Sequence, residues 1–326
     1  MPAPLNLPSL AIGARVENDF LLHKVDLRTL DSGDPYAILT LGNASGTIDT
    51  APFWKERQEE ISGLQRGHVV HVIGDVASYR DRRQLQVSSI RHLPKDRVDV
   101  RALLPSVGAV DRYWEALDKM RREITKPRLR AVVDLFYEAD EFRRRYEECP
   151  AAVAGHHAAI GGLLKHTTEV AAIARTVARA CGADQELVIA GALLHDIGKL
   201  DSYRWDGLFE FTDQGRIVDH VVLGALMLDR RLAEEHEPPC TSLERDLLLH
   251  LILAHHGKRE FGSPVQPMTL EAEVLHWADN ASAKTASMAD VLRDDANFPE
   301  GLVSRPQWTL DHRRAFRGES DWGAEG

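Results

Sequence analysis

Histidine and aspartate residues recur at the ends of predicted helices in the second half of the chain. In residues 187–199 (LVIAGALLHDIGK), an apolar run leads into His195 and Asp196, and Gly198 follows. The apolar run, with Asp184 as a candidate N-cap and the glycine behind it, predicts a short buried helix. Burying an imidazole beside a carboxylate is costly unless both groups are paired or bind a metal ion. This stretch therefore gives the first indication of a metal site.

Four further predicted helices carry the same residue types next to an apolar stripe. His166 lies in a helix opened by the sequence GGLLKH, and His220 stands at the start of another helix. A helix that begins with the capping box TSLE ends in His255 and His256, and the last long helix contains Asp279. A single such histidine is usually a core residue bonded to a backbone carbonyl. Five successive helices are harder to explain in that way, because every unpaired buried imidazole adds a desolvation cost.

Imidazole and carboxylate groups together favour transition metals, whereas calcium and magnesium favour oxygen ligands. Manganese is the favoured ion, with iron, cobalt, nickel and zinc as alternatives. With Asp196 as a bridge, the set is large enough for two ions. Two neighbouring ions form a clamp for phosphodiester hydrolysis, in which one generates hydroxide and both neutralise the phosphate. No serine or cysteine motif suggests a protein nucleophile instead.

The composition is that of a soluble globular protein. The chain has 326 residues, enough for two domains, with 44% hydrophobic and 28% charged residues. The apolar runs are much shorter than the roughly 20 residues of a membrane span, and the N-terminus lacks the pattern of a secretory signal. The three cysteines lie far apart, which argues against disulfides or a cysteine zinc site and favours a cytoplasmic location. The net charge of −10 argues against non-specific coating of nucleic acid, but bound divalent ions would reverse the local field of a nuclease.

The first part of the chain, about residues 12–93, predicts a β domain. Turn residues separate predicted strands, and the segment WKERQEEI at 54–61 favours a helix. Three strands, a helix and two strands is the order of the five-stranded OB barrel, which binds oligonucleotides. The strands recognised by their residue pattern are 36–41, 47–50, 69–76 and 84–90.

Aromatic and arginine side chains of this domain are candidates for nucleic-acid binding, because aromatic rings stack on bases and arginines contact phosphates. They are Tyr36, Phe53, Trp54, Tyr79, Arg80, Arg82 and Arg83. In an equally weighted alternative, Phe53 and Trp54 plug the barrel end and the arginines form a solvated face. From about residue 110 onward the pattern is helical, with Pro127 at the start of one helix.

The order H…HD…H…H…D resembles the HD-domain metal-dependent phosphohydrolases. Behind an OB-like region, the five segments together resemble the YhaM-type 3′-5′ exoribonucleases, from about residue 12 to 300. The segments are GGLLKHT, LLHDIGKL, FTDQGRIVDH, AHHGKREFGSP and LHWADNASAK. The resemblance implies a multidomain fold, an all-β OB barrel followed by an all-α HD-domain bundle. The expected boundaries are 1–95 for the OB domain, 96–150 for a helical connector, 151–300 for the HD core and 301–326 for a C-terminal tail.

The resemblance also implies roles for individual residues. The implied metal ligands are His166, His195, Asp196, His220, His255 and Asp279. The implied catalytic residues are Asp196, Lys199 and His256, and His256 is the alternative to His255 as a ligand. Lys199 is expected to reach a substrate phosphate; the alternative is a helix-end lysine that satisfies carbonyls. His156, His157 and Lys258 are candidate substrate contacts, with a structural role as the alternative for the histidine pair. Two positions depart from the family pattern, Asn43 in the OB turn and Ser282, where relatives tend to have Asp.

The implied activity is 3′-5′ exonucleolytic hydrolysis of single-stranded RNA, with single-stranded DNA as a further substrate, releasing 5′-mononucleotides. Two alternatives remain open from the sequence. One is a phosphohydrolase of nucleotides or cyclic nucleotides, and the other is a non-catalytic factor that binds single strands or promoter DNA. The sequence leaves metal identity, processivity and oligomeric state open.

Overall fold

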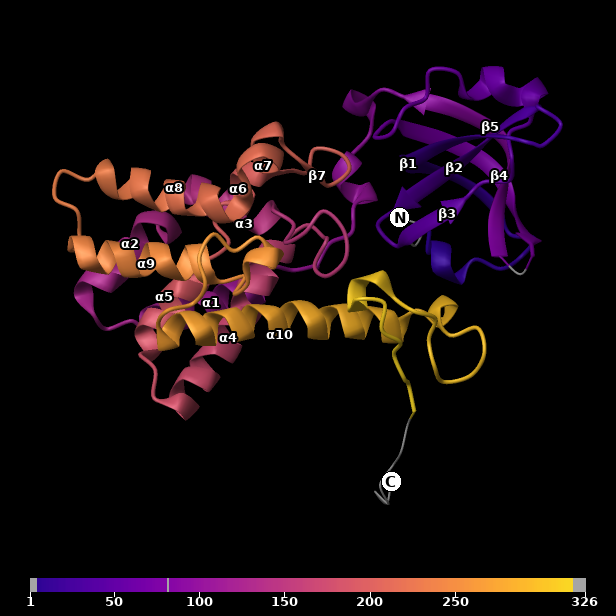
Figure 1. Cartoon of the computed structure of the whole chain (residues 1–326). Coiled ribbons are helices and arrows are strands. Elements are labelled where there is room, and N and C mark those ends of the chain that lie inside the picture. The colour runs from indigo at the N-terminus through magenta and orange to yellow at the C-terminus, as the bar shows by residue number, and fades with distance from the viewer. Residues whose placement is uncertain (1–4, 81, 319–326) are drawn as a thin grey trace. The chain divides into compact units, whose positions relative to one another are not determined.

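The computed structural model describes residues 5–80 and 82–318, and the chain folds into two compact units (Figure 1). The first unit ends at Ser106 and also includes Trp205–Leu208. The second comprises Val107–Arg204 and resumes at Phe209. Within the described residues, no helix is long and apolar enough to cross a membrane.

The first unit is a closed five-stranded barrel. Its neighbouring strands pair antiparallel in the order β3-β2-β1-β4-β5, and a parallel bridge from Thr50 to Leu85 joins the two edges. The strands are β1 (Arg15–Thr29), β2 (Pro35–Asn43), β3 (Gly46–Asp49), β4 (Val69–Tyr79) and β5 (Arg82–Leu93). Register shifts at Leu22/Lys24 and Ile73/Gly74 bend the long strands around the barrel. The predicted OB topology is confirmed.

Alternating apolar residues of all five strands fill the barrel, with Phe20, Leu39 and Val72 completely buried. The helix predicted at 54–61 is the 3₁₀ helix η2 (Lys55–Ile61), which lies between β3 and β4 in the chain and adds Ile61 to the core. Three shorter 3₁₀ helices complete the unit: η1 (Leu7–Ser9), η3 (Lys95–Arg97) and η4 (Val100–Leu103).

The second unit is a helical bundle around α5 (Gln185–Leu194). Every residue of this helix from Val188 to Leu194 is buried, and α2, α4, α9 and α10 pack around it. The Asp184 side chain caps α5 by accepting hydrogen bonds from the backbone N–H groups of Glu186 and Leu187. The short buried helix predicted from the sequence is thus confirmed.

Two other helices begin where the sequence indicates. Pro127 is the first residue of α2, and Thr241 and Glu244 form the capping box of α9. The helices are α1 (Asp111–Arg122), α2 (Pro127–Tyr137), α3 (Asp140–Glu148), α4 (Gly162–Cys181), α6 (Lys199–Ser202), α7 (Asp213–Val218), α8 (His220–Ala233), α9 (Ser242–Ala254) and α10 (Leu270–Arg293), with the 3₁₀ helix η5 (Arg259–Phe261). Strands β6 (Tyr203–Arg204) and β7 (Glu210–Phe211) form an antiparallel hairpin.

The segment after α10, yellow in Figure 1, folds back on that helix. Its buried residues Phe298, Leu310 and Ala315 form a small core with Val291 of α10. This segment contains the 3₁₀ helices η6 (Asp295–Asn297) and η7 (Trp308–Leu310). Through residue 318, the stretch expected to be a tail is therefore part of the helical unit.

Candidate metal centre

The predicted metal ligands converge on the carboxylate of Asp196, although they come from five separate parts of the chain. The Nε2 atoms of His166 and His195 lie 3.4 and 3.2 Å from Asp196 Oδ2. The Nε2 atoms of His220 and His255 lie 3.6 and 3.8 Å from Oδ1 of the same carboxylate. The two oxygens of Asp196 therefore face two different pairs of imidazoles.

The possible ligand atoms form two groups, and within each group they lie within 4.8 Å of one another. The first group is His166, His195 and Asp196, and the second is His220, His255 and His256. Asp279 belongs beside the first group, since its Oδ1 is 3.0 Å from Nε2 of His166. Sequence reasoning treated His255 and His256 as alternatives, but the structure brings both imidazoles to the second group.

Each imidazole of the two groups is oriented by a partner for its outer nitrogen, Nδ1. Three of these partners are main-chain carbonyls: Ala192 for His195 at 2.7 Å, Ile252 for His255 at 2.6 Å and Phe261 for His256 at 2.9 Å. A carbonyl can only accept, so Nδ1 must carry the proton and Nε2 keeps its lone pair. This tautomer is the one in which a histidine binds a metal through Nε2.

His220 is oriented by Asp219, the residue before it. Nδ1 of His220 lies 2.9 Å from Oδ1 of Asp219, which also accepts a hydrogen bond from the Val221 N–H at the start of α8. Asp219 has a φ of 71°, in a region that residues other than glycine rarely adopt. The hydrogen bond to His220 lowers the pKa of the Asp219 carboxyl group. Sequence reasoning missed this residue, although its place directly before His220 was a usable signal.

Ser282 orients His166. Its hydroxyl donates a hydrogen bond to Glu169 at 2.9 Å and lies 3.0 Å from Nδ1 of His166, so it accepts from that nitrogen. Glu169 also receives a bond from His157 Nε2 at 2.9 Å. Relatives tend to have an aspartate where this chain has Ser282. Here the carboxylate of the network comes from Glu169, which is joined to His166 through the serine hydroxyl.

The interior of the site lacks enough hydrogen-bond partners for its polar atoms. Among the described residues, the buried atoms Nε2 of His195, Oδ1 of Asp196 and Nε2 of His220 have no hydrogen bond. Buried polar atoms without a hydrogen bond are rare, because burying each one costs free energy of desolvation. The two nitrogen atoms lie 3.2 and 3.6 Å from the oxygens of Asp196, so a divalent cation bound there would satisfy all three atoms. The residues therefore fit a divalent metal site.

The charges of the site point the same way. Burial lowers the pKa of His166 and His255, so these imidazoles are neutral near pH 7 and offer lone pairs. Burial opposes ionisation of Asp196 and Asp279, but the neighbouring histidines hold the pKa of each carboxyl below its usual range. His195 differs, because the neighbouring Asp196 outweighs its burial and raises the pKa of its imidazole. Imidazole and carboxylate together are nevertheless the donor set that transition-metal ions prefer.

Lys199 lies at the first group. Its Nζ is 2.6 Å from Oδ2 of Asp196, and its side chain is almost fully buried. Burial disfavours the ammonium ion, but Asp196 raises the pKa of Lys199 above its ordinary value. The partner of Lys199 is thus the carboxylate of a candidate ligand and not the helix-end carbonyls of the alternative interpretation.

Two of the three other candidate contacts, His156 and His157, lie beside His166. The His156 ring is 6.1 Å from the His166 ring, and burial lowers the pKa of His156 to about 4. His157 is buried in the Glu169 network, which supports the structural alternative for this residue. Lys258 is exposed, and its Nζ lies 3.6 Å from Glu260. His276 donates a hydrogen bond from Nδ1 to the main-chain carbonyl of His255 at 2.9 Å, so it supports a candidate ligand from behind.

Some of the proposed nucleic-acid contacts of the barrel are accessible, whereas others already pack or form hydrogen bonds within the barrel. Trp54 is 44% exposed, and its ring lies 5.3 Å from that of Tyr36. Tyr79 is exposed, with the Arg80 guanidinium 5.2 Å from its ring centroid, and Arg82 is also exposed. Trp54, Tyr79, Arg80 and Arg82 form the exposed part of the predicted surface, and Tyr36 is half-buried.

Two predicted contacts are already engaged within the barrel unit. Phe53 is 1% exposed and belongs to the barrel core, so its ring fills the barrel and is not available to stack on a base. Arg83 donates hydrogen bonds to the main-chain carbonyls of Pro8 and Leu10. For Phe53 the plug interpretation therefore agrees with the structure, whereas for Trp54 it does not.

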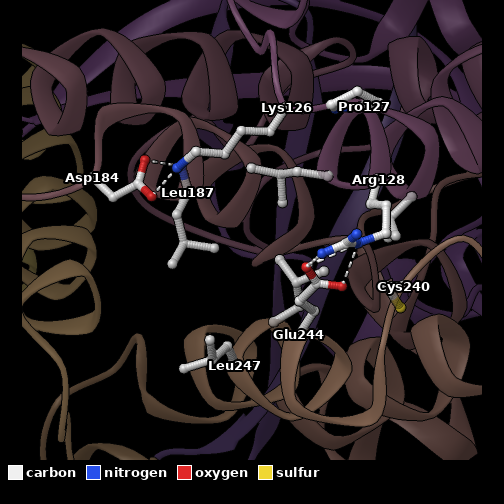
Figure 2. Close-up of a pocket in the computed structure, with 11 residues that line it drawn as sticks. Lys126, Pro127, Arg128, Asp184, Leu187, Cys240, Glu244 and Leu247 are labelled. Carbon is white, nitrogen blue, oxygen red and sulfur yellow. Dashed lines mark hydrogen bonds and ion pairs between the residues drawn. The ribbon is translucent and has the colours of Figure 1, made fainter.

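A separate pocket of about 450 Å³ lies at the other ends of α5 and α9 (Figure 2). It is lined by Leu187, in the first turn of α5, and by Leu247 in α9, whereas the candidate ligands follow the last residues of these helices. Ion pairs of Lys126 with Asp184 and of Arg128 with Glu244 lie in the pocket. None of its lining residues is a predicted site residue.

This chain matches one family model and resembles curated proteins along most of its length. Residues 163–284 match the HD domain family. The chain is 30% identical over 319 residues to the 3′-5′ exoribonuclease YhaM of Listeria welshimeri, covering 94% of this chain and 96% of that protein. The protein of the same name from Oceanobacillus iheyensis is 30% identical, with 91% and 92% covered. The one from Bacillus subtilis is 29% identical, with 94% and 96% covered.

Proposed function

Because the chain belongs to the YhaM family of 3′-5′ exoribonucleases, we propose that it shortens single-stranded RNA from the 3′ end at a centre of two divalent ions in its HD domain. The chain is a hydrolase that acts on phosphodiester bonds. The proposed products are 5′-mononucleotides. Manganese is the proposed ion, and single-stranded DNA is a proposed second substrate.

The arrangement around Asp196 carries the proposal. Its Oδ2 faces His166 and His195, and its Oδ1 faces His220 and His255. A carboxylate placed between two imidazole groups suits a bridging ligand of two ions. Two such ions supply Lewis-acid chemistry, which lowers the pKa of water and neutralises charge on the scissile phosphate.

The residues of the chain orient the groups of this centre. The outer hydrogen bonds of the histidines fix the Nε2 atoms toward the interior before any ion binds, so little reorganisation is needed. Lys199 keeps a buried positive charge next to Asp196. We propose that this ammonium group also meets the phosphate of the substrate, where negative charge develops during hydrolysis.

The barrel is proposed to bind the single strand through the exposed Trp54 ring, the half-buried Tyr36 ring beside it, and the Tyr79 and Arg80 pair. Stacking on aromatic rings tolerates any base, as an exonuclease requires. A polymer-binding domain also favours RNA over free nucleotides as the substrate. A cytoplasmic location is part of the proposal, in line with the three free cysteines.

The test is a time course with 5′-labelled RNA, matching DNA and a panel of free and cyclic nucleotides, each with manganese, magnesium, zinc or no metal. We expect a ladder that shortens one nucleotide at a time on RNA, and release of 5′-mononucleotides. Asp196→Asn is expected to abolish the ladder while keeping the affinity of the barrel for RNA. Cleavage of free nucleotides alone would show instead that the nucleotide phosphohydrolase is the correct alternative.

A further inference from the structure

A small pocket lies next to the candidate metal centre. Its volume is about 240 Å³, smaller than the roughly 300 Å³ at which pockets for drug-sized ligands begin. Three segments form its walls: the loop with Gly155 and His156, the α10 residue Lys284, and Trp308 of η7 with the nearby Asp311. All of these residues belong to the helical unit.

The pocket and the metal centre share a wall. His156 lines the pocket, and its ring lies 6.1 Å from the ring of His166, which belongs to the first ligand group. On α10, Ala283 lines the pocket and directly follows Ser282, which orients His166. A strand whose terminal phosphodiester is at the ions would therefore have its adjoining nucleotide within reach of this pocket.

Trp308 is presented at the pocket by a segment that is fixed in place. The residue is 64% exposed, but Leu310 in the same short helix is completely buried against α10. A methyl group on Gly155 would lie 3.5 Å from Cη2 of the indole, so the ring edge packs against that loop. An exposed tryptophan alone is ordinary on a protein surface. Here, however, it is one wall of a pocket beside the reacting centre.

A positive charge lies in the same pocket. Nζ of Lys284 is 2.7 Å from Oδ2 of Asp311, an ion pair that joins α10 to the C-terminal segment. The ammonium group is partly exposed and can turn one of its other N–H donors toward an anion. An aromatic face beside a cation is the usual combination for holding one nucleotide of a single strand, through its base and its phosphate.

We propose that Trp308 stacks on a base within the last two nucleotides of the RNA and thereby positions the terminal phosphodiester at the ions. This inference rests on the proposed function. It gives the C-terminal segment a role in substrate binding, and makes Trp308 a positioning residue that acts through contact with the base. Because stacking needs only a flat ring, the pocket accepts all four bases.

The experiment compares the full-length wild-type protein, Trp308→Ala, Trp308→Phe and Phe316→Ala in the presence of manganese. Phe316 is the matched control, since it is an exposed aromatic residue of the same segment that does not line the pocket. Each protein is given a short RNA, and the same RNA with an abasic residue at the last or the next-to-last position. Metal content and thermal unfolding are measured for every variant.

We expect Trp308→Ala to raise KM for the intact RNA roughly tenfold with little change in kcat and unchanged metal content. Trp308→Phe should restore most of the affinity, and Phe316→Ala should behave as wild type. Removal of the base at one of the two positions should cost the wild-type protein about tenfold in kcat/KM and cost Trp308→Ala nothing further.

Two results would overturn the inference while leaving the exonuclease intact. One is a wild-type protein that degrades both abasic RNAs as fast as the intact RNA, which needs no variant to observe. The other is an abasic penalty of equal size in wild type and Trp308→Ala. If the wild-type protein shortens no RNA with any metal, the proposed function itself is wrong and this inference falls with it.

Discussion

The hydroxyl of Ser282 lies 3.0 Å from Nδ1 of His166, and through it the imidazole is linked to the carboxylate of Glu169. Ser282 accepts a hydrogen bond from His166 and donates one to Glu169, so the Glu169 carboxylate helps to orient the His166 imidazole through the serine. The His166 imidazole is held with its Nε2 toward Asp279 and Asp196.

Ser282→Ala should weaken metal binding, because it removes the acceptor that selects the tautomer of His166. Loss of such an outer hydrogen bond typically costs 10- to 100-fold in metal affinity. Calorimetric titration of the metal-depleted protein with manganese measures the change. Ser287→Ala is the matched control, since Ser287 is buried on the same helix but bonds the main-chain carbonyl of Ala283. Equal affinities for the two variants would show that Ser282 does not orient a ligand.

Substitutions in the two ligand groups should remove ions separately. His166→Ala and His220→Ala are each expected to reduce the metal content from about two ions per chain to about one, because each removes a ligand of one group only. Asp196→Asn should lower occupancy of both positions, since both oxygens of the carboxylate face ligands. Elemental analysis after dialysis in limiting metal gives the counts. A single ion in the wild-type protein would contradict the two-ion proposal.

Removal of the metal should destabilise the helical unit and leave the barrel unaffected. A ligand present at 100 times its dissociation constant adds about 2.7 kcal/mol to the free energy of unfolding. For a domain of this size, that is a change in Tm of roughly 5–11 °C, at about 2–4 °C per kcal/mol. Differential scanning calorimetry with manganese and with a chelator measures it. The barrel transition serves as the internal control, and an equal shift in both transitions would indicate a general effect of the ion.

Adjacent residues of the barrel should separate stability from binding. Phe53→Ala is expected to lower the free energy of unfolding by about 3–5 kcal/mol, because the ring fills the barrel core. Trp54→Ala should change stability little and weaken RNA binding by about 1–3 kcal/mol, the typical value for one stacked base. Chemical denaturation and fluorescence anisotropy with labelled RNA give the two quantities. A loss of RNA affinity in Asp196→Asn as large as that in Trp54→Ala would show that the barrel is not the main binding surface.

The helices around the centre were predictable because local signals mark their ends. Asp184, Pro127 and the capping box at Thr241 all lie where the sequence indicates. The strand–helix order of the barrel was predictable for the same reason, since glycine-rich turns and alternating apolar residues are local features. The resemblance to a known family then brought the scattered histidines and aspartates into one ligand set.

What the sequence could not show depends on contacts between distant segments. Phe53 and Trp54 are neighbours in the chain, but one ring points into the barrel and the other is exposed, which only the packed barrel decides. Glu169 looks like a surface residue of α4 until α10 places Ser282 against it. Trp308 follows a stretch without helical or strand periodicity, and its position depends on the burial of Leu310 against α10.

The dispersal of the candidate ligands from His166 to Asp279 has a practical consequence. No fragment that lacks either end of that span can keep a complete set of donors around Asp196. If the purified protein retains its ions, every helix between His166 and Asp279 must be correctly packed. A melting curve or a gel alone does not give this information. A nicked or partly assembled preparation would reveal itself through metal lost on dialysis, before any assay of catalysis is run.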